Sequence, residues 1–176
     1  MQRVVIADAG PLIALARVGQ LNLLPRLFGS VSVTAWVADE VLNGGDFPDS
    51  AGLRAAFTEP WLLTVEAPIP DADVWQAQCQ ALIHLHQIDM GEASALVMAH
   101  TLAAQGDAAL LLMDDFRGRQ AALHSSVATM GTAGVLMLAK QAGAIEAVKP
   151  ILISLRHSGY FLSDRLVESV LAQAGE

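Results

Sequence analysis

Apolar residues form two short runs in which every position is hydrophobic, at residues 4–6 and 109–113. A strand with one face in water alternates apolar and polar residues, whereas a parallel strand covered on both faces does not. The two runs therefore predict buried strands of a parallel sheet. Three further apolar segments predict strands at 31–35, 61–65 and 127–130.

Helical patterns separate these strands. The region 92–105 is the clearest, with Ala93, Leu96, Val97 and Ala104 on one face. Strands that alternate with helices predict an α/β protein whose parallel sheet carries helices on both faces. The other expected helices cover 12–16, 21–28, 36–42, about 70–86, 117–123, 131–142 and 145–157 with a break at Pro150, together with a final helix capped by Ser163 and a weak helix within the loop 46–58.

Composition narrows the class of protein. The chain has 176 residues, of which 53% are hydrophobic, and no linker-like stretch divides it, so a single domain over 1–176 is expected. The most apolar region, 121–139, also holds polar residues, so we expect no membrane span, and no signal peptide pattern is present. A lone cysteine, Cys79, fits a reducing cytoplasm. The net charge of −8 argues against a surface that binds nucleic acid everywhere, but it allows a local basic patch.

Acidic residues follow both fully apolar strands. Asp8 comes directly after the first strand, and Asp114 and Asp115 come after the fourth. Ligands of open α/β sheets bind at the carboxyl ends of the strands, so these side chains are candidates for one site. Glu40 and Glu92 lie early in helices that can point to the same edge. Grouped carboxylates bind hard divalent cations, which predicts Mg²⁺ or Mn²⁺ and a phosphodiester substrate.

Six stretches, which cover nearly the whole chain in the family's order, resemble the PIN-domain superfamily, and within it a branch described only as a domain of unknown function with predicted nucleic-acid binding. The resemblance implies a three-layer α/β/α sandwich on a parallel sheet of about five strands, a metal-dependent ribonuclease activity, and often a toxin partnered by an antitoxin. Carried over by motif, Asp8, Glu40, Glu92 and Asp114 correspond to the family's four acids, with Asp115 adjacent. The stretches are IADAGPLIAL, LFGSVSVTAWVADEVL, DMGEASALVMA, LLLMDDFRGRQAA, MGTAGVLMLAK and GYFLS.

The sequence departs from many PIN nucleases at two places. Glu92 stands where many carry Asp, and LMDD at 112–115 replaces a Thr-x-Asp or Ser-x-Asp pattern. The longer Glu side chain changes the distance to a metal. The missing hydroxyl leaves open whether Asp114 or Asp115 is the fourth ligand.

Each acid also has a local explanation. Asp8 is a common turn residue before glycine and proline, and Glu40 alone is an ordinary surface acid of a helix. Asp89 and Glu92 have the spacing of a capping box, and Asp115 can cap the helix that follows it. Only the joint occurrence of these acids at strand ends and helix starts favours a shared site.

Two features predict contacts to phosphate. Arg117 and Arg119 follow Asp114 and match phosphate geometry, although exposed arginines are often only solvated. The turn Gly131–Gly134, which includes Thr132, could hold a phosphate on backbone N–H groups, although such glycines more often allow a tight turn.

The sequence therefore predicts a cytoplasmic, metal-dependent endoribonuclease of PIN type. Its substrate would be RNA, and an antitoxin protein and a second copy of the chain are compatible partners. One alternative is a catalytically weak nucleic-acid-binding or regulatory protein on the same fold, which Glu92, the LMDD pattern and the net acidity favour. A further alternative is a small-molecule phosphohydrolase on the same sheet.

Overall fold

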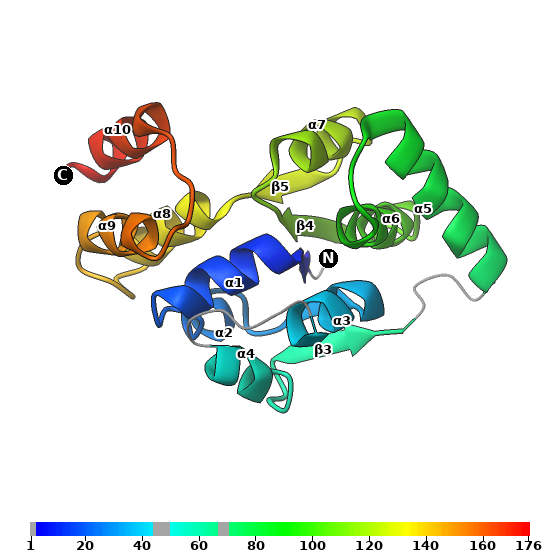
Figure 1. Cartoon of the computed structure of the whole chain (residues 1–176), viewed down its shortest axis with the longest axis horizontal. Helices are drawn as coiled ribbons and strands as arrows, with labels where there is room; N and C mark the ends of the chain where they lie inside the picture. Colours follow the sequence, from blue (N-terminus) through cyan, green and yellow to red (C-terminus); the bar gives the residue numbers. More distant parts are fainter. Residues whose placement is uncertain (1–2, 44–49, 67–70) are drawn as a thin grey trace.

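A parallel sheet of five strands, in the order β3-β2-β1-β4-β5, forms the centre of the protein. The computed structural model describes residues 3–43, 50–66 and 71–176. Helices lie on both faces of the sheet (Figure 1), so the α/β/α architecture and the five strands predicted from the sequence are confirmed. The strands are β1 (Arg3–Ala7), β2 (Val31–Thr34), β3 (Leu62–Val65), β4 (Ala108–Leu112) and β5 (Ala128–Met130).

The helices follow the predicted pattern with one clear difference. The helix expected at 145–157 begins only at Lys149, because Pro150 lacks an N–H and is tolerated in the first turn of a helix but not in its interior. The helix start expected at Pro70 lies outside the described residues, and so do Gly44 and Gly45, which together with Asn43 are expected to end the helix 36–42. Asn43 is instead the last residue of that helix. Within the described part of the chain, no helix is both long and apolar enough to cross a membrane. The helices are α1 (Ala9–Arg17), α2 (Leu23–Phe28), α3 (Ala35–Asn43), α4 (Ser50–Ala56), α5 (Ala72–His86), α6 (Met90–Ala104), α7 (Phe116–His124), α8 (Thr132–Gln141), α9 (Lys149–His157) and α10 (Asp164–Ala174).

Strand β1 separates two hydrophobic cores. Val5 and Ala7 belong to the core that includes residues of α1, α2 and α8, and Ile6 between them belongs to the core of α5, α6 and α7. Leu111 of β4 joins Ile6 in the second core. All four side chains are buried, which confirms that the continuous apolar runs are covered on both faces. Full burial of a leucine or isoleucine side chain stabilises the fold by about 1.5 to 3 kcal/mol.

The strand register places the carboxyl ends of β1 and β4 side by side. Ala7 pairs with Leu112, and the Asp8 N–H donates to the Leu112 carbonyl at 3.0 Å. Asp8 follows β1 directly, and Asp114 lies two residues beyond β4. Because β2 lies on one side of β1 and β4 on the other, this edge is the topological switch point, where open α/β sheets bind ligands.

Candidate acidic site at the carboxyl edge of the sheet

Asp8 lies at the end of the middle strand, immediately before α1, and only 7% of its surface is exposed. Burial raises the pKa of its carboxyl to about 7, with smaller increases from the charges of Asp89, Glu92 and Glu40 and a partial offset from the Ala9 N–H. Its side chain forms no capping hydrogen bond at the start of α1. Asp8 is therefore a buried acid that faces other acids.

Asp89 and Glu92 cap the start of α6 reciprocally. The Glu92 N–H donates to Asp89 Oδ1 at 2.8 Å, and the Asp89 N–H donates to Glu92 Oε2 at 3.0 Å, which confirms the predicted capping box. Glu92 is nonetheless buried, and this burial raises its pKa to about 7, with contributions from the charges of Asp89 and Asp115. A role in the cap is thus compatible with a place among the acids.

Glu40 reaches the start of α6 through the space that Gly91 leaves open. A Cβ atom at Gly91 would lie 2.7 Å from Glu40 Oε2, 3.3 Å from Asp89 Oδ1 and 3.7 Å from Asp8 Oδ1. Three carboxylates therefore converge on the first turn of α6, where the helix dipole favours negative charge. Burial and the charge of Asp89 raise the pKa of Glu40.

Two buried hydroxyl groups connect β2 and α3 to α6. The oxygens Thr34 Oγ1 and Ser94 Oγ lie 2.7 Å apart. Thr34 Oγ1 also accepts from the Val37 N–H at 3.3 Å, and Ser94 Oγ donates to the Gly91 carbonyl at 2.8 Å. Because Glu40 is carried by α3, this link fixes the position of Glu40 relative to Gly91.

The Asp114 carboxylate accepts three hydrogen bonds beside the start of α8. The Thr132 N–H donates to Oδ1 at 2.7 Å, and the Thr132 and Tyr160 hydroxyls each donate to Oδ2 at 2.5 Å. Burial and the Asp114 charge raise the pKa of Tyr160, which keeps its phenol protonated. A carboxylate has about four acceptor positions, so most of those on Asp114 are occupied.

These bonds also change the role expected of Thr132. Its side chain is fully buried, and both its N–H and its hydroxyl donate to Asp114. The N-terminus of α8 therefore interacts with a carboxylate of the protein, at the place where the sequence predicted a phosphate. Thr132 therefore positions Asp114, and its predicted contact with a phosphate stays a prediction.

Asp115 caps α7, as its local explanation predicted, because Oδ1 accepts from the Gly118 N–H at 2.9 Å. Its charge also raises the pKa of Glu92, so the two carboxylates lie close together. Asp114 lies near Asp8, because a Cβ at Gly10 would lie 3.8 Å from Asp8 Oδ2 and 4.0 Å from Asp114 Oδ2. Of Asp114 and Asp115, Asp115 has more acceptor capacity left.

The two arginines that follow Asp114 have different surroundings. Arg117 Nη1 donates to the carbonyl and to Oε1 of Gln87, at 3.3 and 3.4 Å. A Cβ at Gly131 would lie 3.3 Å from Arg119 Nη1 and 2.8 Å from Asp114 Oδ1, so the Arg119 guanidinium lies beside Asp114. Within the described residues, Arg119 forms no ion pair. Arg119 is therefore the better placed of the two to meet a phosphate.

The donor set fits a hard divalent cation in its chemistry. All the donors are carboxylate oxygens, and buried acids with raised pKa values gain from a nearby positive charge. As the side chains are placed, however, no three His, Cys, Asp or Glu residues in the described ranges come within reach of one ion. Metal binding by Asp8, Glu40, Glu92 and Asp114 together therefore stays a prediction. The exposed side chain of Glu40 would have to turn to join such a set.

The sequence predicts only a capping role for Asp89 and no role for Tyr160. In the structure, Asp89 is the leading charge that raises the pKa of Asp8, Glu40 and Glu92. Two acids three residues apart at one helix start were a usable signal for Asp89. Tyr160 has no local signal, because its partner Asp114 is 46 residues away.

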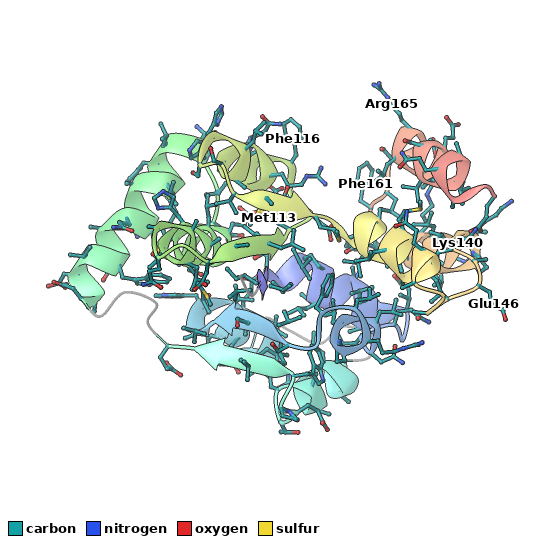
Figure 2. The ribbon with its side chains drawn as sticks, turned by 180° about the vertical axis from the view of Figure 1, so that it is seen from behind. Met113, Phe116, Lys140, Glu146, Phe161 and Arg165 are labelled. Carbon is teal, nitrogen blue, oxygen red and sulfur yellow. The ribbon has the colours of Figure 1, made fainter. Side chains whose placement is uncertain are left out.

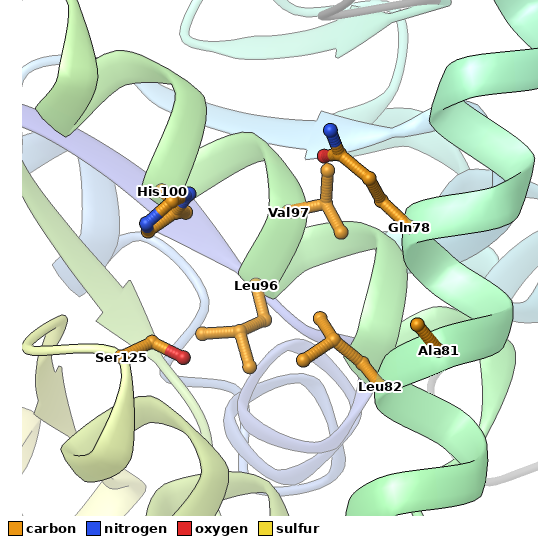
Figure 3. Close-up of a pocket in the computed structure, with 7 residues that line it drawn as sticks. All are labelled: Gln78, Ala81, Leu82, Leu96, Val97, His100 and Ser125. Carbon is orange, nitrogen blue, oxygen red and sulfur yellow. The ribbon is translucent and has the colours of Figure 1, made fainter.

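A separate hollow of about 240 Å³ lies between α5 and α6 (Figure 3). Leu82, Leu96 and Val97 give it a mainly apolar lining, to which His100 also contributes. None of the acids described above lines this hollow, so it is not part of the candidate site.

A known protein family matches nearly the whole chain. The sequence model of the family DUF3368, described as a PIN domain, matches residues 4–176. Comparison with curated proteins gives no match. The matched range contains every acid of the candidate site.

Proposed function

The chain belongs to the PIN-domain family, and from that premise we propose that it is a metal-dependent endoribonuclease. PIN domains are generally nuclease folds. The observation that carries the proposal is the convergence of Asp8, Glu40 and Asp89 on the start of α6 beside the buried Glu92. Asp8 and Glu92 are the buried acids of this group, and like charges that are buried destabilise a fold, so their place at the sheet edge favours a functional explanation.

In this proposal Asp8, Glu92 and Glu40 hold Mg²⁺ or Mn²⁺, together with Asp114 or Asp115. When bound, the ion would neutralise phosphate oxygens and make an attacking water more acidic. Arg119 would bind a phosphate oxygen of the substrate, since a guanidinium matches that geometry. Thr132 and Tyr160 would keep Asp114 oriented through the three hydrogen bonds described above.

Cleavage of labelled single-stranded RNA tests this function. The wild-type protein should cut RNA with Mn²⁺ or Mg²⁺ and lose the activity in EDTA. Asp8→Asn and Glu92→Gln should each remove nearly all cleavage while circular dichroism shows that the variants are folded. The matched control is Asp107→Asn, an exposed acid outside the site, which should cleave normally. Cleavage that survives both EDTA and Asp8→Asn would refute the proposal.

A second candidate is a protein of the same fold that binds RNA without cutting it. Two observations favour it: among the residues that the structure describes, no three acids are within reach of one ion, and Asp114 already accepts three hydrogen bonds. This candidate predicts RNA binding without any cleavage in Mg²⁺ or Mn²⁺. The assay above therefore separates the two.

We also propose that the protein acts as the toxin of a toxin–antitoxin pair. An antitoxin segment could place an Arg or Lys among the acids and neutralise them as a cation would. Purification from the native host should then yield a small protein bound to the chain. Isolation of the chain alone, together with harmless overexpression, would count against this partner.

A further inference from the structure

Three Trp or Phe side chains are exposed among the described residues, and all three lie beside the acids. The exposed fractions are 50% for Trp36, 66% for Phe116 and 88% for Phe161. Trp36 lines a hollow with Glu40, and Phe116 and Phe161 line a cleft with Asp114. Exposed aromatic groups that gather around one site indicate a binding surface.

Phe161 is held in place although its ring is exposed to water. The preceding residue, Tyr160, is hydrogen-bonded to Asp114. The following residue, Leu162, is buried, and its carbonyl accepts a hydrogen bond from Arg156 at 3.0 Å. Because both neighbours are anchored, the Phe161 backbone is already ordered, and only the side-chain freedom of its exposed ring is lost when the ring binds a partner.

The cleft between Phe116 and Phe161 has the size and the lining of a binding site. Its volume is about 570 Å³, within the range of about 300 to 1,000 Å³ typical of ligand pockets. Figure 2 shows Phe116 on α7 and Phe161 on the side of α10, and the cleft is also lined by Asp114 and Arg119. The cleft thus combines two aromatic rings, the Arg119 guanidinium and the Asp114 carboxylate.

Trp36 lies on the opposite side of the acids from these rings. It follows β2, Phe116 follows β4, and Asp8 follows β1 between them. Two strand spacings, about 10 Å, separate β2 from β4. Aromatic residues therefore flank the acids on both sides along the edge of the sheet.

Electrostatics limits what can bind there. The chain carries a net charge of −8, and the acids repel a phosphate backbone, so general charge attraction cannot supply most of the affinity. Stacking of bases on aromatic rings supplies binding energy without needing net positive charge. A duplex keeps its bases stacked inside and cannot offer their faces to these rings.

We propose that Trp36, Phe116 and Phe161 stack on the unpaired bases of a single-stranded RNA whose backbone crosses the acids, with Arg119 on a phosphate. The inference rests on the proposed function, because it names the substrate and the base-binding residues of the same site.

Binding of a fluorescein-labelled 12-nucleotide single-stranded RNA, measured by anisotropy in EDTA, tests the inference without cleavage. Trp36→Ala, Phe116→Ala and Phe161→Ala should each weaken the affinity by between about 5-fold and about 100-fold. Phe161→Trp should bind as wild type does. Leu85→Ala and Leu123→Ala are matched controls, because these exposed apolar side chains lie outside the site, and they should not change the affinity. The same RNA in duplex form should bind less tightly than the single strand.

Tryptophan fluorescence gives an independent readout. RNA should quench the emission of the wild-type protein, and Trp36→Phe should lose this quenching while it keeps the affinity. Unchanged affinity of all three alanine variants, or equal binding of duplex, would overturn the inference even if the wild type cleaves RNA with Mn²⁺. Stacking-dependent binding without any cleavage would support the inference and overturn the proposed nuclease activity.

Discussion

Replacement of Asp8 by asparagine measures how much the buried charge of Asp8 lowers the free energy of unfolding. Asp8→Asn keeps nearly the same shape and removes one negative charge from a site that Asp89, Glu92 and Glu40 also make negative. Because Asp8 forms no capping hydrogen bond at α1, little structural stabilisation is lost with its charge. We therefore expect the variant to be more stable than wild type at neutral and alkaline pH without metal.

The sign and size follow from proton linkage. The pKa of Asp8 is about 7 in the folded protein and has its ordinary value of 3.8 in the unfolded chain. At pH values between these two, the folded protein therefore binds more protons than the unfolded chain does. The free energy of unfolding contributed by Asp8 therefore falls as pH rises from about 4 to about 7, and is level above. About two pH units of this range lie above pH 5, and over each of them the free energy of unfolding falls by about 1.4 kcal/mol. The stability advantage of Asp8→Asn should thus grow by about 3 kcal/mol from pH 5 to pH 8.

Urea unfolding of both proteins at pH 5 and pH 8 in EDTA measures this difference, with Asp107→Asn as the control that should show no such growth. At pH 8, Mn²⁺ at about one hundred times its dissociation constant should add about 2.7 kcal/mol to the wild type and little to Asp8→Asn. A stability difference that is independent of pH, or an equal response of both proteins to Mn²⁺, would refute the reasoning.

Three further predictions test other parts of the site and the fold. In Gly91→Ala the flexible end of Glu40 must move away, and the Asp89 carboxylate must shift by a few tenths of an ångström. Because both are side-chain ends, the variant should gain about 0.5 to 1 kcal/mol in the free energy of unfolding and lose metal-dependent cleavage; a destabilised variant in thermal unfolding would contradict this. Arg119→Ala should weaken RNA binding and reduce its salt slope by about one, and an unchanged slope in a salt titration would remove Arg119 from the interface. Hydrogen bonds from Lys140 and from two backbone N–H groups lower the pKa of Glu176 to about 2. The wild type should therefore lose stability as pH falls from about 4.5 to 2, and Glu176→Gln should lose less, as measured by acid titration followed by circular dichroism.

The strands and the first acids could be predicted because their signals are local. The apolar run that contains Leu111 identifies a strand buried on both faces, and the acids that follow such runs must lie at the carboxyl edge of a parallel sheet. The position of Glu40 could not be predicted in this way, because it depends on the Thr34–Ser94 contact between segments 60 residues apart. The different surroundings of Arg117 and Arg119 likewise depend on tertiary neighbours.

Local roles and a shared site do not exclude each other in this protein. Asp89, Glu92 and Asp115 all form the capping bonds that their spacing predicted. At the two N-cap positions, Asp89 and Asp115, asparagine or serine would cap a helix about as well, so the N-cap bonds alone do not explain the charges there. The helix dipole favours an acid at such a position by about 0.3 to 1 kcal/mol. Asp8 forms no cap and is still buried, with its pKa raised to about 7. Asp8 and Glu92 are the buried members of this group, and their raised pKa values mean that their charges destabilise the fold. A bound cation at the edge of the sheet would offset that destabilisation.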